Sequence, residues 1–156
     1  DVWSLSELKD AILAGEIGAI YISYHDIVGL PEELSAGCGG AIGHVPLVIY
    51  QGTNCCQTSE KAQIVLPAAA FAEREGTVTN FEGLVQIQRK AFEPVCGVLP
   101  GWEIMQRLGV ALGGSYAFES AEEVFTELAQ KEPAFAGLSY RKIGSGGCRA
   151  KGVKSQ

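Results

Sequence analysis

No apolar run in this sequence approaches the roughly 20 residues that a helix needs to cross a bilayer, so direct membrane insertion is not expected. Positive charge is also scarce: 12 Lys and Arg stand against 18 Asp and Glu, giving a formal net charge of −6. Because phosphate binding needs a basic face, this balance argues against nucleic acid as a partner. The start, DVWSLSELKD, has neither a signal peptide nor an initiator Met. We therefore expect a chain that begins partway through a longer polypeptide or after processing.

The cysteine spacing excludes several kinds of site. The five cysteines are odd in number and none belongs to a Cys-x-x-Cys pair, so neither a disulfide framework nor a cysteine-ligated metal or cluster site is predicted. The adjacent Cys55 and Cys56 make a poor chelator, because neighbouring side chains of an extended chain point apart. We expect five reduced thiols in a cytosolic setting.

Other motifs of catalysis and ligand binding are also absent. The glycine group within residues 37–43 fits neither the dinucleotide fingerprint nor the P-loop, and it precedes a strand, so a flexible loop is predicted. His25 and His44 lack partners at ligand spacing, which favours surface or loop histidines over a metal pair or a general base. With no Gly-x-Ser-x-Gly and no Cys–His arrangement, no catalytic residue is predicted in this segment.

Hydrophobic patterning predicts an α/β fold. An amphipathic helix that Ser4 or Ser6 can cap, and that Gly15 can end, leads into an apolar strand over 17–23. Largely apolar runs at 45–50 and 63–66 predict two further strands. Short apolar strands of this kind are typical of a parallel sheet covered on both faces.

The second half of the sequence is predicted to be mainly helical. Helices are expected over 102–112 and, from a capping box at Ser120 and Glu123, through Leu128. An extended segment is expected over 84–90. In the first half, residues 29–44 are expected to form a loop that can hold a short helix from Pro31 to about Ser35. We assign residues 1–115 to a partial α/β domain and residues 116–156 to a helical extension with a mobile basic tail.

Many spaced matches, in order and over nearly the whole chain, resemble the molybdopterin oxidoreductase superfamily. The segment LSELKDAILAGEIGAIYIS is similar to a helix that precedes a strand in that family, and Trp102 opens a matching helix. The densest block follows the family pattern A-D-V-V-L-P and then E-x-x-G-T-x-x-N-x-E-G-R-x-Q. Its matches here are Ala62, Ile64, Val65, Leu66, Pro67, Glu73, Gly76, Thr77, Asn80, Glu82, Gly83 and Gln86. The resemblance implies a partial Rossmann-like parallel sheet flanked by helices, in a formate-dehydrogenase/DMSO-reductase-type domain.

Within the superfamily, the Glu82–Gly83 pair favours the molybdopterin-like domain of an electron-transfer subunit in the peripheral arm of NADH-quinone oxidoreductase, respiratory complex I. That resemblance implies a structural role among other subunits of a respiratory complex, on the cytoplasmic side of the inner membrane, with iron–sulfur clusters elsewhere in the subunit and no cofactor bound by this segment. The alternative is a fragment of a molybdopterin-dependent enzyme similar to formate dehydrogenase, which contributes to the cleft for molybdopterin guanine dinucleotide. A third, weaker possibility is a free-standing remnant of such a domain that has a binding role only.

The polar residues Thr77, Asn80 and Glu82 are the candidates for cofactor binding, if pterin binding is retained. Two departures from the family pattern weigh against it: Gln63 stands where Asp is usual, and Leu84 where Arg is usual. Losing both charges removes groups that a polar ligand would use. The competing interpretation is a self-satisfied turn, in which Asn and Thr side chains bond nearby backbone and Gly76 supplies a positive φ.

Overall fold

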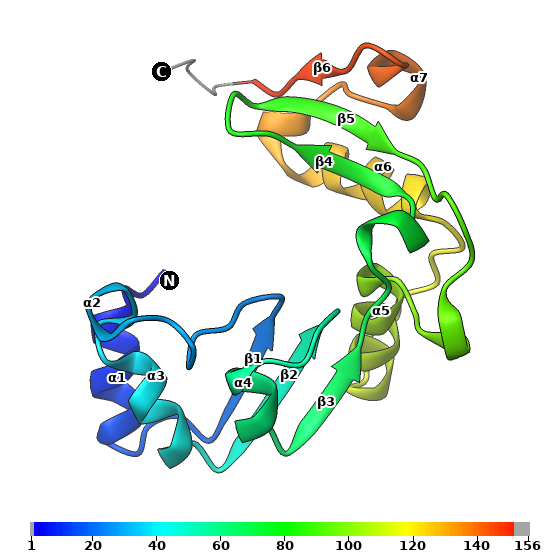
Figure 1. Cartoon of the computed structure of the whole chain (residues 1–156). Coiled ribbons are helices and arrows are strands. Elements are labelled where there is room, and N and C mark those ends of the chain that lie inside the picture. Colours follow the sequence, from blue (N-terminus) through cyan, green and yellow to red (C-terminus); the bar gives the residue numbers. More distant parts are fainter. Residues whose placement is uncertain (1, 152–156) are drawn as a thin grey trace. The chain divides into compact units, whose positions relative to one another are not determined.

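The computed structural model describes residues 2–151, and its contacts divide the chain into two compact units, one up to Ala68 and one from Ala69 (Figure 1). The division falls directly after the third strand of the parallel sheet. The second unit therefore combines residues from both sides of the limit at 115 that the sequence analysis used. No helix among the described residues is long and apolar enough to cross a membrane.

The first unit is built on a three-stranded parallel sheet in the order β1-β2-β3. Its strands are β1 (Ala19–Ser23), β2 (Leu47–Gly52) and β3 (Ile64–Pro67). The register aligns Ala19 with Leu47 and Ile49 with Ile64, so β2 is the central strand. The predicted strands and their parallel arrangement are thereby confirmed.

The first unit also contains four helices, of which the sequence analysis predicted the first two. They are α1 (Leu5–Leu13), α2 (Glu32–Ser35), α3 (Cys38–Ala41) and α4 (Gln57–Lys61), with a 3-10 turn over Ile42–His44. Ser4 caps α1: its hydroxyl accepts from the amide of Glu7 at 3.2 Å, and the Glu7 carboxylate accepts from the amide of Ser4 at 2.7 Å. This reciprocal capping satisfies two amides that the helix leaves unpaired.

Two short helices lie within the segment 29–44. The short helix predicted near Pro31 is present as α2, whereas the prediction of a loop over the glycine group was wrong, because α3 forms there. Cys38 and Ile42 are fully buried in a core that includes Ile12 of α1 and Val48 of β2. Gly39 lets α3 approach the preceding chain, because a Cβ there would lie only 2.6 Å from the carbonyl oxygen of Ile27. The glycine therefore serves close packing.

The outer strand of this sheet is more exposed than the sequence predicts. Ile64 and Val65 of β3 are 43% and 49% exposed, although cover on both faces was expected. Among residues 2–151, β3 lies at the edge of the sheet and pairs with β2 alone. Gln63, just before β3, strengthens that pairing, since its amide oxygen accepts from the backbone amide of Val48 at 2.6 Å.

The second unit carries an antiparallel sheet in the order β4-β5-β6. Its elements are β4 (Gly76–Thr79), β5 (Leu84–Gln88), α5 (Gly101–Ala111), α6 (Ala121–Lys131), α7 (Tyr140–Ile143) and β6 (Cys148–Arg149), with 3-10 turns at Phe71–Glu73, Val95–Gly97 and Pro133–Phe135. The predicted helices and the extended segment at 84–90 are present. Strand β4 was missed, because its four residues GTVT give too short a pattern to identify.

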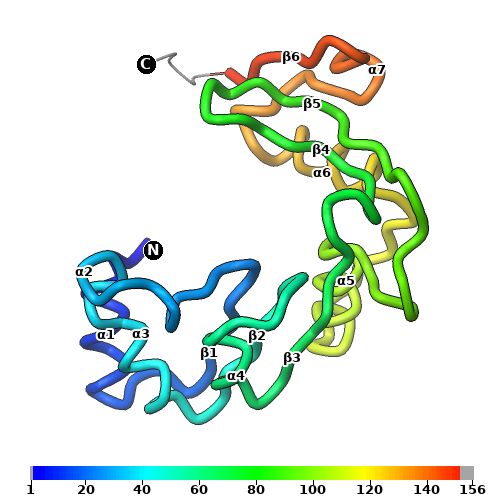
Figure 2. The backbone as a smooth tube through the Cα atoms, in the orientation of Figure 1, coloured from blue at the N-terminus to red at the C-terminus, as the bar shows by residue number. Residues whose placement is uncertain are grey.

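The described part of the predicted basic tail contains a strand, β6. Cys148 pairs with Val85 and Arg149 with Leu84, so β6 lies beside β5 although the two are far apart in sequence (Figure 2). Ala150 is buried in the core of this unit, beside Phe125. Burial and strand pairing hold this segment in place. Neither can be predicted from its glycine-rich and basic composition. The rest of the predicted tail, 152–156, lies outside the described residues.

The close approach at Gly39 gives a test of this packing. We expect Gly39→Ala to lower the free energy of unfolding by about 1–3 kcal/mol, because the new methyl group meets the Ile27 carbonyl. The matched control is Gly40→Ala, since a Cβ there meets nothing within 4 Å. It should be neutral or stabilising by up to about 1 kcal/mol. Urea unfolding followed by circular dichroism measures the stability of both variants. Equal changes in the free energy of unfolding would contradict the close packing of Gly39 against Ile27.

Candidate functional site

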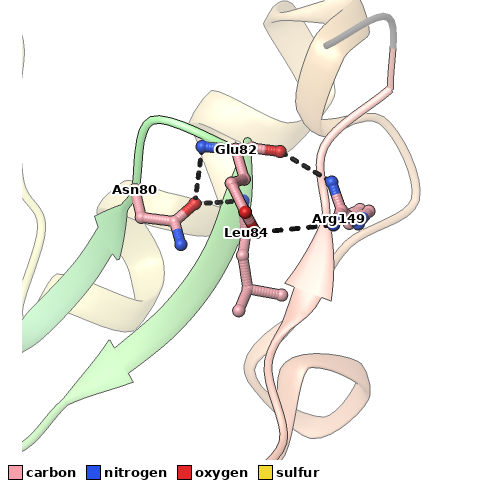
Figure 3. A network of polar contacts seen from close by, with 4 residues as sticks. All are labelled: Asn80, Glu82, Leu84 and Arg149. Atoms are coloured by element: carbon pink, nitrogen blue, oxygen red, sulfur yellow. Dashed lines mark hydrogen bonds and ion pairs between the residues drawn. The ribbon is translucent and has the colours of Figure 1, made fainter. Parts of the chain in front are cut away.

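The turn between β4 and β5 holds two of the three predicted ligand-binding residues, Asn80 and Glu82 (Figure 3). The side-chain oxygen of Asn80 accepts from the amides of Glu82 at 3.0 Å and Leu84 at 2.9 Å. The backbone of Asn80 closes the turn, with its amide donating to Leu84 at 3.0 Å and its carbonyl accepting from Gly83 at 2.9 Å. Asn80 thus makes the bonds expected of a self-satisfied turn.

The glycine that this turn requires is Gly83. Its φ of 76° lies in the left-handed region that glycine enters at no steric cost, whereas Gly76 opens β4 with a nearly extended φ of 159°. The sequence analysis assigned a positive φ to Gly76, and Gly76 does have one, but it lies at the start of β4 and outside the turn. The left-handed residue of the turn, Gly83, directly precedes β5.

Glu82 is held by an arginine that the sequence analysis did not single out. One terminal nitrogen of Arg149 donates to the carbonyl oxygen of Glu82 at 2.9 Å, and the other lies 3.5 Å from its carboxylate (Figure 3). Both side chains are about half exposed, at 56% and 47%, so the ion pair itself contributes little. The sequence carried no signal for this contact, because Arg149 lies in the segment expected to be mobile.

Thr77 lies apart from the turn, within β4 opposite Ile87 of β5. It lines a hollow of about 260 Å³, whose other walls include Arg74, Trp102 and Phe125. The structure therefore brings Asn80 and Glu82 together and places Thr77 in a different environment. The three predicted residues do not form one cluster.

The oxygen acceptors of the turn have partners within the chain. The Asn80 side-chain oxygen accepts two backbone amides, and the Glu82 carboxylate lies 3.5 Å from Arg149. Cofactor binding by Thr77, Asn80 and Glu82 stays a prediction. Among residues 2–151 there is also no group of three His, Cys, Asp or Glu that could hold a metal ion, and all five cysteines are free.

A second polar cluster, which the sequence analysis missed, lies at the carboxyl ends of β1 and β2. One carboxylate oxygen of Asp26 accepts from the hydroxyl of Thr58 at 2.7 Å, from its amide at 2.9 Å and from the amide of Gly29 at 3.1 Å. The fully buried Thr58 hydroxyl also accepts from the amide of Val28 at 3.0 Å. Carboxyl ends of parallel strands are where α/β proteins bind ligands.

The electrostatics of this cluster follow from its hydrogen bonds. The Thr58 hydroxyl lowers the pKa of Asp26. Burial opposes it, and the backbone amides of Thr58 and Gly29 lower the pKa further. Nearby in β2, the Cys56 thiol, together with burial, raises the pKa of Tyr50 to about 12. Asp26 is therefore ionised and internally bonded. The cluster connects the loop after β1 to helix α4. The hydrogen bonds of Asp26 to Thr58 and Gly29 are all made within this chain.

Comparisons with known proteins agree on the family. The family model for molybdopterin oxidoreductase matches residues 4–111. The chain is 38% identical over 109 residues to the F420-dependent formate dehydrogenase 2 subunit alpha of Methanococcus maripaludis, covering 69% of this chain and 16% of that protein. It is 28% identical over 137 residues to the probable oxidoreductase YjgC of Bacillus subtilis, covering 88% of this chain and 14% of that protein.

A solved structure supports the fold. Acetylene hydratase from Pelobacter acetylenicus matches with a TM-score of 0.63 and 18% sequence identity, covering 94% of this chain and 21% of that one. At this identity the match concerns the fold alone. It agrees with the mixed α/β architecture and its parallel sheet. The chain thus spans a small part of the length of each relative.

The Asp26–Thr58 bonds can be tested by stability against pH. At pH 7 we expect Thr58→Val to lower the free energy of unfolding by about 1–3 kcal/mol, since a buried hydroxyl with two partners is lost. Because the folded pKa of Asp26 is lowered, its contribution is present above the unfolded pKa and is lost as pH falls through the folded value.

The stability gap between wild type and Thr58→Val should therefore narrow as pH falls below about 4. Thr53→Val, at an exposed threonine of the same region, is the control and should change stability by less than about 0.5 kcal/mol. Denaturant unfolding at several pH values measures both variants. If the difference in free energy of unfolding between wild type and Thr58→Val stays constant across the acid range, the pKa of Asp26 does not depend on Thr58.

Proposed function

Because the chain belongs to the molybdopterin oxidoreductase family, we propose that it is the α/β part of a molybdopterin-dependent enzyme similar to formate dehydrogenase, in which it borders the cofactor cleft. The similarity to formate dehydrogenase subunits is the observation that carries this proposal. Two such subunits of Methanococcus maripaludis are 38% and 34% identical to this chain over 109 residues. The chain spans 16% of the length of each subunit. The proposed activity is therefore that of a longer protein, of which this chain would be one part.

The proposed role of this part is to form a wall of the cleft. The parallel sheet presents the carboxyl ends of its strands, the edge where α/β proteins accommodate ligands. The polar groups found there are bonded within the chain, as in the Asp26–Thr58 contact at 2.7 Å. In this proposal the cofactor is molybdopterin guanine dinucleotide, which supplies the redox chemistry when bound. The hydrogen-bond donors to its phosphates, the ligands of its metal and the iron–sulfur clusters would belong to other parts of the enzyme.

A second candidate is the molybdopterin-like domain of the electron-transfer subunit of NADH-quinone oxidoreductase. The Glu82–Gly83 pair and the internally bonded turn favour it, since a domain kept for architecture needs no free ligand-binding groups. Its role would be packing against partner subunits of a respiratory complex, peripheral on the cytoplasmic side of the inner membrane. Electrons from NADH to quinone would pass through clusters elsewhere in that subunit.

Metal content and activity of the intact protein distinguish the two candidates. For the formate dehydrogenase-like enzyme, we expect about one molybdenum per polypeptide by mass spectrometry of metals, an extractable pterin, and formate-dependent reduction of a viologen dye. For the subunit of respiratory complex I, we expect no molybdenum and co-purification with NADH-oxidising subunits. Molybdenum-free protein that assembles with those subunits would overturn the first proposal, and stoichiometric molybdenum with pterin would overturn the second.

A further inference from the structure

Helix α5 of the second unit is rich in apolar residues but poorly buried (Figure 1). Among its described residues Ile104 alone is buried, whereas Met105 and Val110 are each 49% exposed. Together with the segment that follows it, α5 lines a cavity of about 380 Å³ that lies wholly within the second unit. Small-molecule sites are concave, mainly apolar and about 300–1,000 Å³ in volume. The cavity is therefore large enough for a small ligand.

The walls of this cavity favour an aromatic ligand. They consist mainly of aromatic and aliphatic side chains: Trp102, Met105, Leu108, Leu112, Tyr116 and Phe118. Aromatic rings attract one another in edge-to-face and offset-stacked arrangements, and the sulfur of methionine makes favourable contacts with ring edges. Three rings and one thioether around a single cavity thus suit a flat aromatic molecule.

The charges near the cavity select for a neutral ligand. No charged side chain is among the described residues that line it. On α5, Glu103 and Arg107 pair with each other, with the carboxylate oxygen and a guanidinium nitrogen 2.6 Å apart. A buried ion needs a partner of opposite charge, and its transfer from water is costly without one. An uncharged lining is therefore complementary to an uncharged molecule.

Two features form the cavity before any ligand binds. The side chain of Gln106 holds the backbone of Phe118 from both sides: its nitrogen donates to the carbonyl at 3.1 Å, and its oxygen accepts from the amide at 2.7 Å. The ring of Tyr116 lies against two glycines, Gly109 and Gly114, where a Cβ would lie only 2.7 and 2.5 Å from its Cε2 atom. A pocket formed in advance loses less entropy on binding.

We propose that this cavity is a binding site for a neutral aromatic molecule of one or two rings. The phenol of Tyr116 is the one hydroxyl among the lining side chains, and it is the hydrogen-bond partner for a hydroxyl or ring N–H of that ligand. The proposal goes beyond the proposed function, because it concerns a ligand of its own and holds with or without a cofactor.

Fluorine NMR of 5-fluoroindole with the full 156-residue chain tests the site. We expect saturable binding with a dissociation constant of about 0.1–1 mM, as for other ligands of about ten non-hydrogen atoms. The anion 5-fluoroindole-2-carboxylate should bind at least about tenfold more weakly, because its charge finds no partner in the cavity. Tyr116→Phe should weaken the binding of 5-fluoroindole about fivefold and leave that of 1-fluoronaphthalene, which has no polar group, unchanged.

Two pairs of variants locate the site. Leu112 and Val95 are both highly exposed, at 79% and 68%, but only Leu112 lines the cavity. Leu112→Glu should weaken binding of 5-fluoroindole at least about fivefold, whereas Val95→Glu should leave it unchanged. Gly109→Ala, which displaces the ring of Tyr116, should weaken binding about tenfold although alanine favours a helix. Gly146→Ala, where a Cβ meets nothing within 4 Å, should have no effect. Circular dichroism verifies that each variant is folded.

Three results would overturn the proposal. One is the lack of saturable binding of 5-fluoroindole to folded wild-type protein up to about 5 mM. Another is binding that Leu112→Glu and Val95→Glu weaken equally, or that the carboxylate shares. The third is a dimer in sedimentation velocity that Leu112→Glu dissociates and Val95→Glu does not, because the cavity would then belong to the contact between two copies of the chain.

Discussion

The requirement that buried and turn-forming polar groups find hydrogen-bond partners shapes both units of this protein. The amide oxygen of Gln63 accepts from the backbone of β2, that of Asn80 accepts from two amides of the turn, and the carboxylate of Asp26 accepts three bonds from Thr58 and Gly29. Of the buried side-chain nitrogen and oxygen atoms in residues 2–151, only the Tyr140 hydroxyl lacks a partner. The strands, turns and loop ends keep their positions because these groups are paired.

This pairing decides what the candidate residues can do. A side chain whose oxygen already accepts two backbone amides has little capacity left for a ligand, and the carboxylate of Glu82 is paired with Arg149. The sequence analysis weighed a pterin-binding loop against a self-satisfied turn, and the bonds of Asn80 are those of the turn. Family membership rests on the match over residues 4–111 and does not depend on free ligand-binding groups in this turn. The same pairing gives Gln63 a structural role, because its side-chain oxygen accepts a hydrogen bond from the backbone of β2.

Much of the first unit could be predicted from sequence, since apolar runs of strand length and a capped amphipathic helix are local signals. The prediction failed where tertiary contacts decide the structure. The glycine-rich segment 29–44 has loop-like composition, yet α3 forms because Gly39 admits the Ile27 backbone and Cys38 enters the core. The last described residues have a frayed composition, yet β6 forms because β5 offers an edge and Ala150 is buried. Thr77, close to Asn80 in sequence, lies elsewhere because it stands within β4 and the turn begins only at Asn80.

The sequence by itself determined the family, the parallel strands and the cap of α1, because each is a pattern of neighbouring or regularly spaced residues. Only the tertiary structure decided which polar side chains meet. Asp26, in the loop after β1, bonds Thr58 of α4, which is 32 residues away in sequence. Arg149 of β6 bonds Glu82 of the β4–β5 turn, which is 67 residues away. Contacts of this kind depend on strand register and on the close approach of backbones, and neither leaves a periodic trace in the residues that make them.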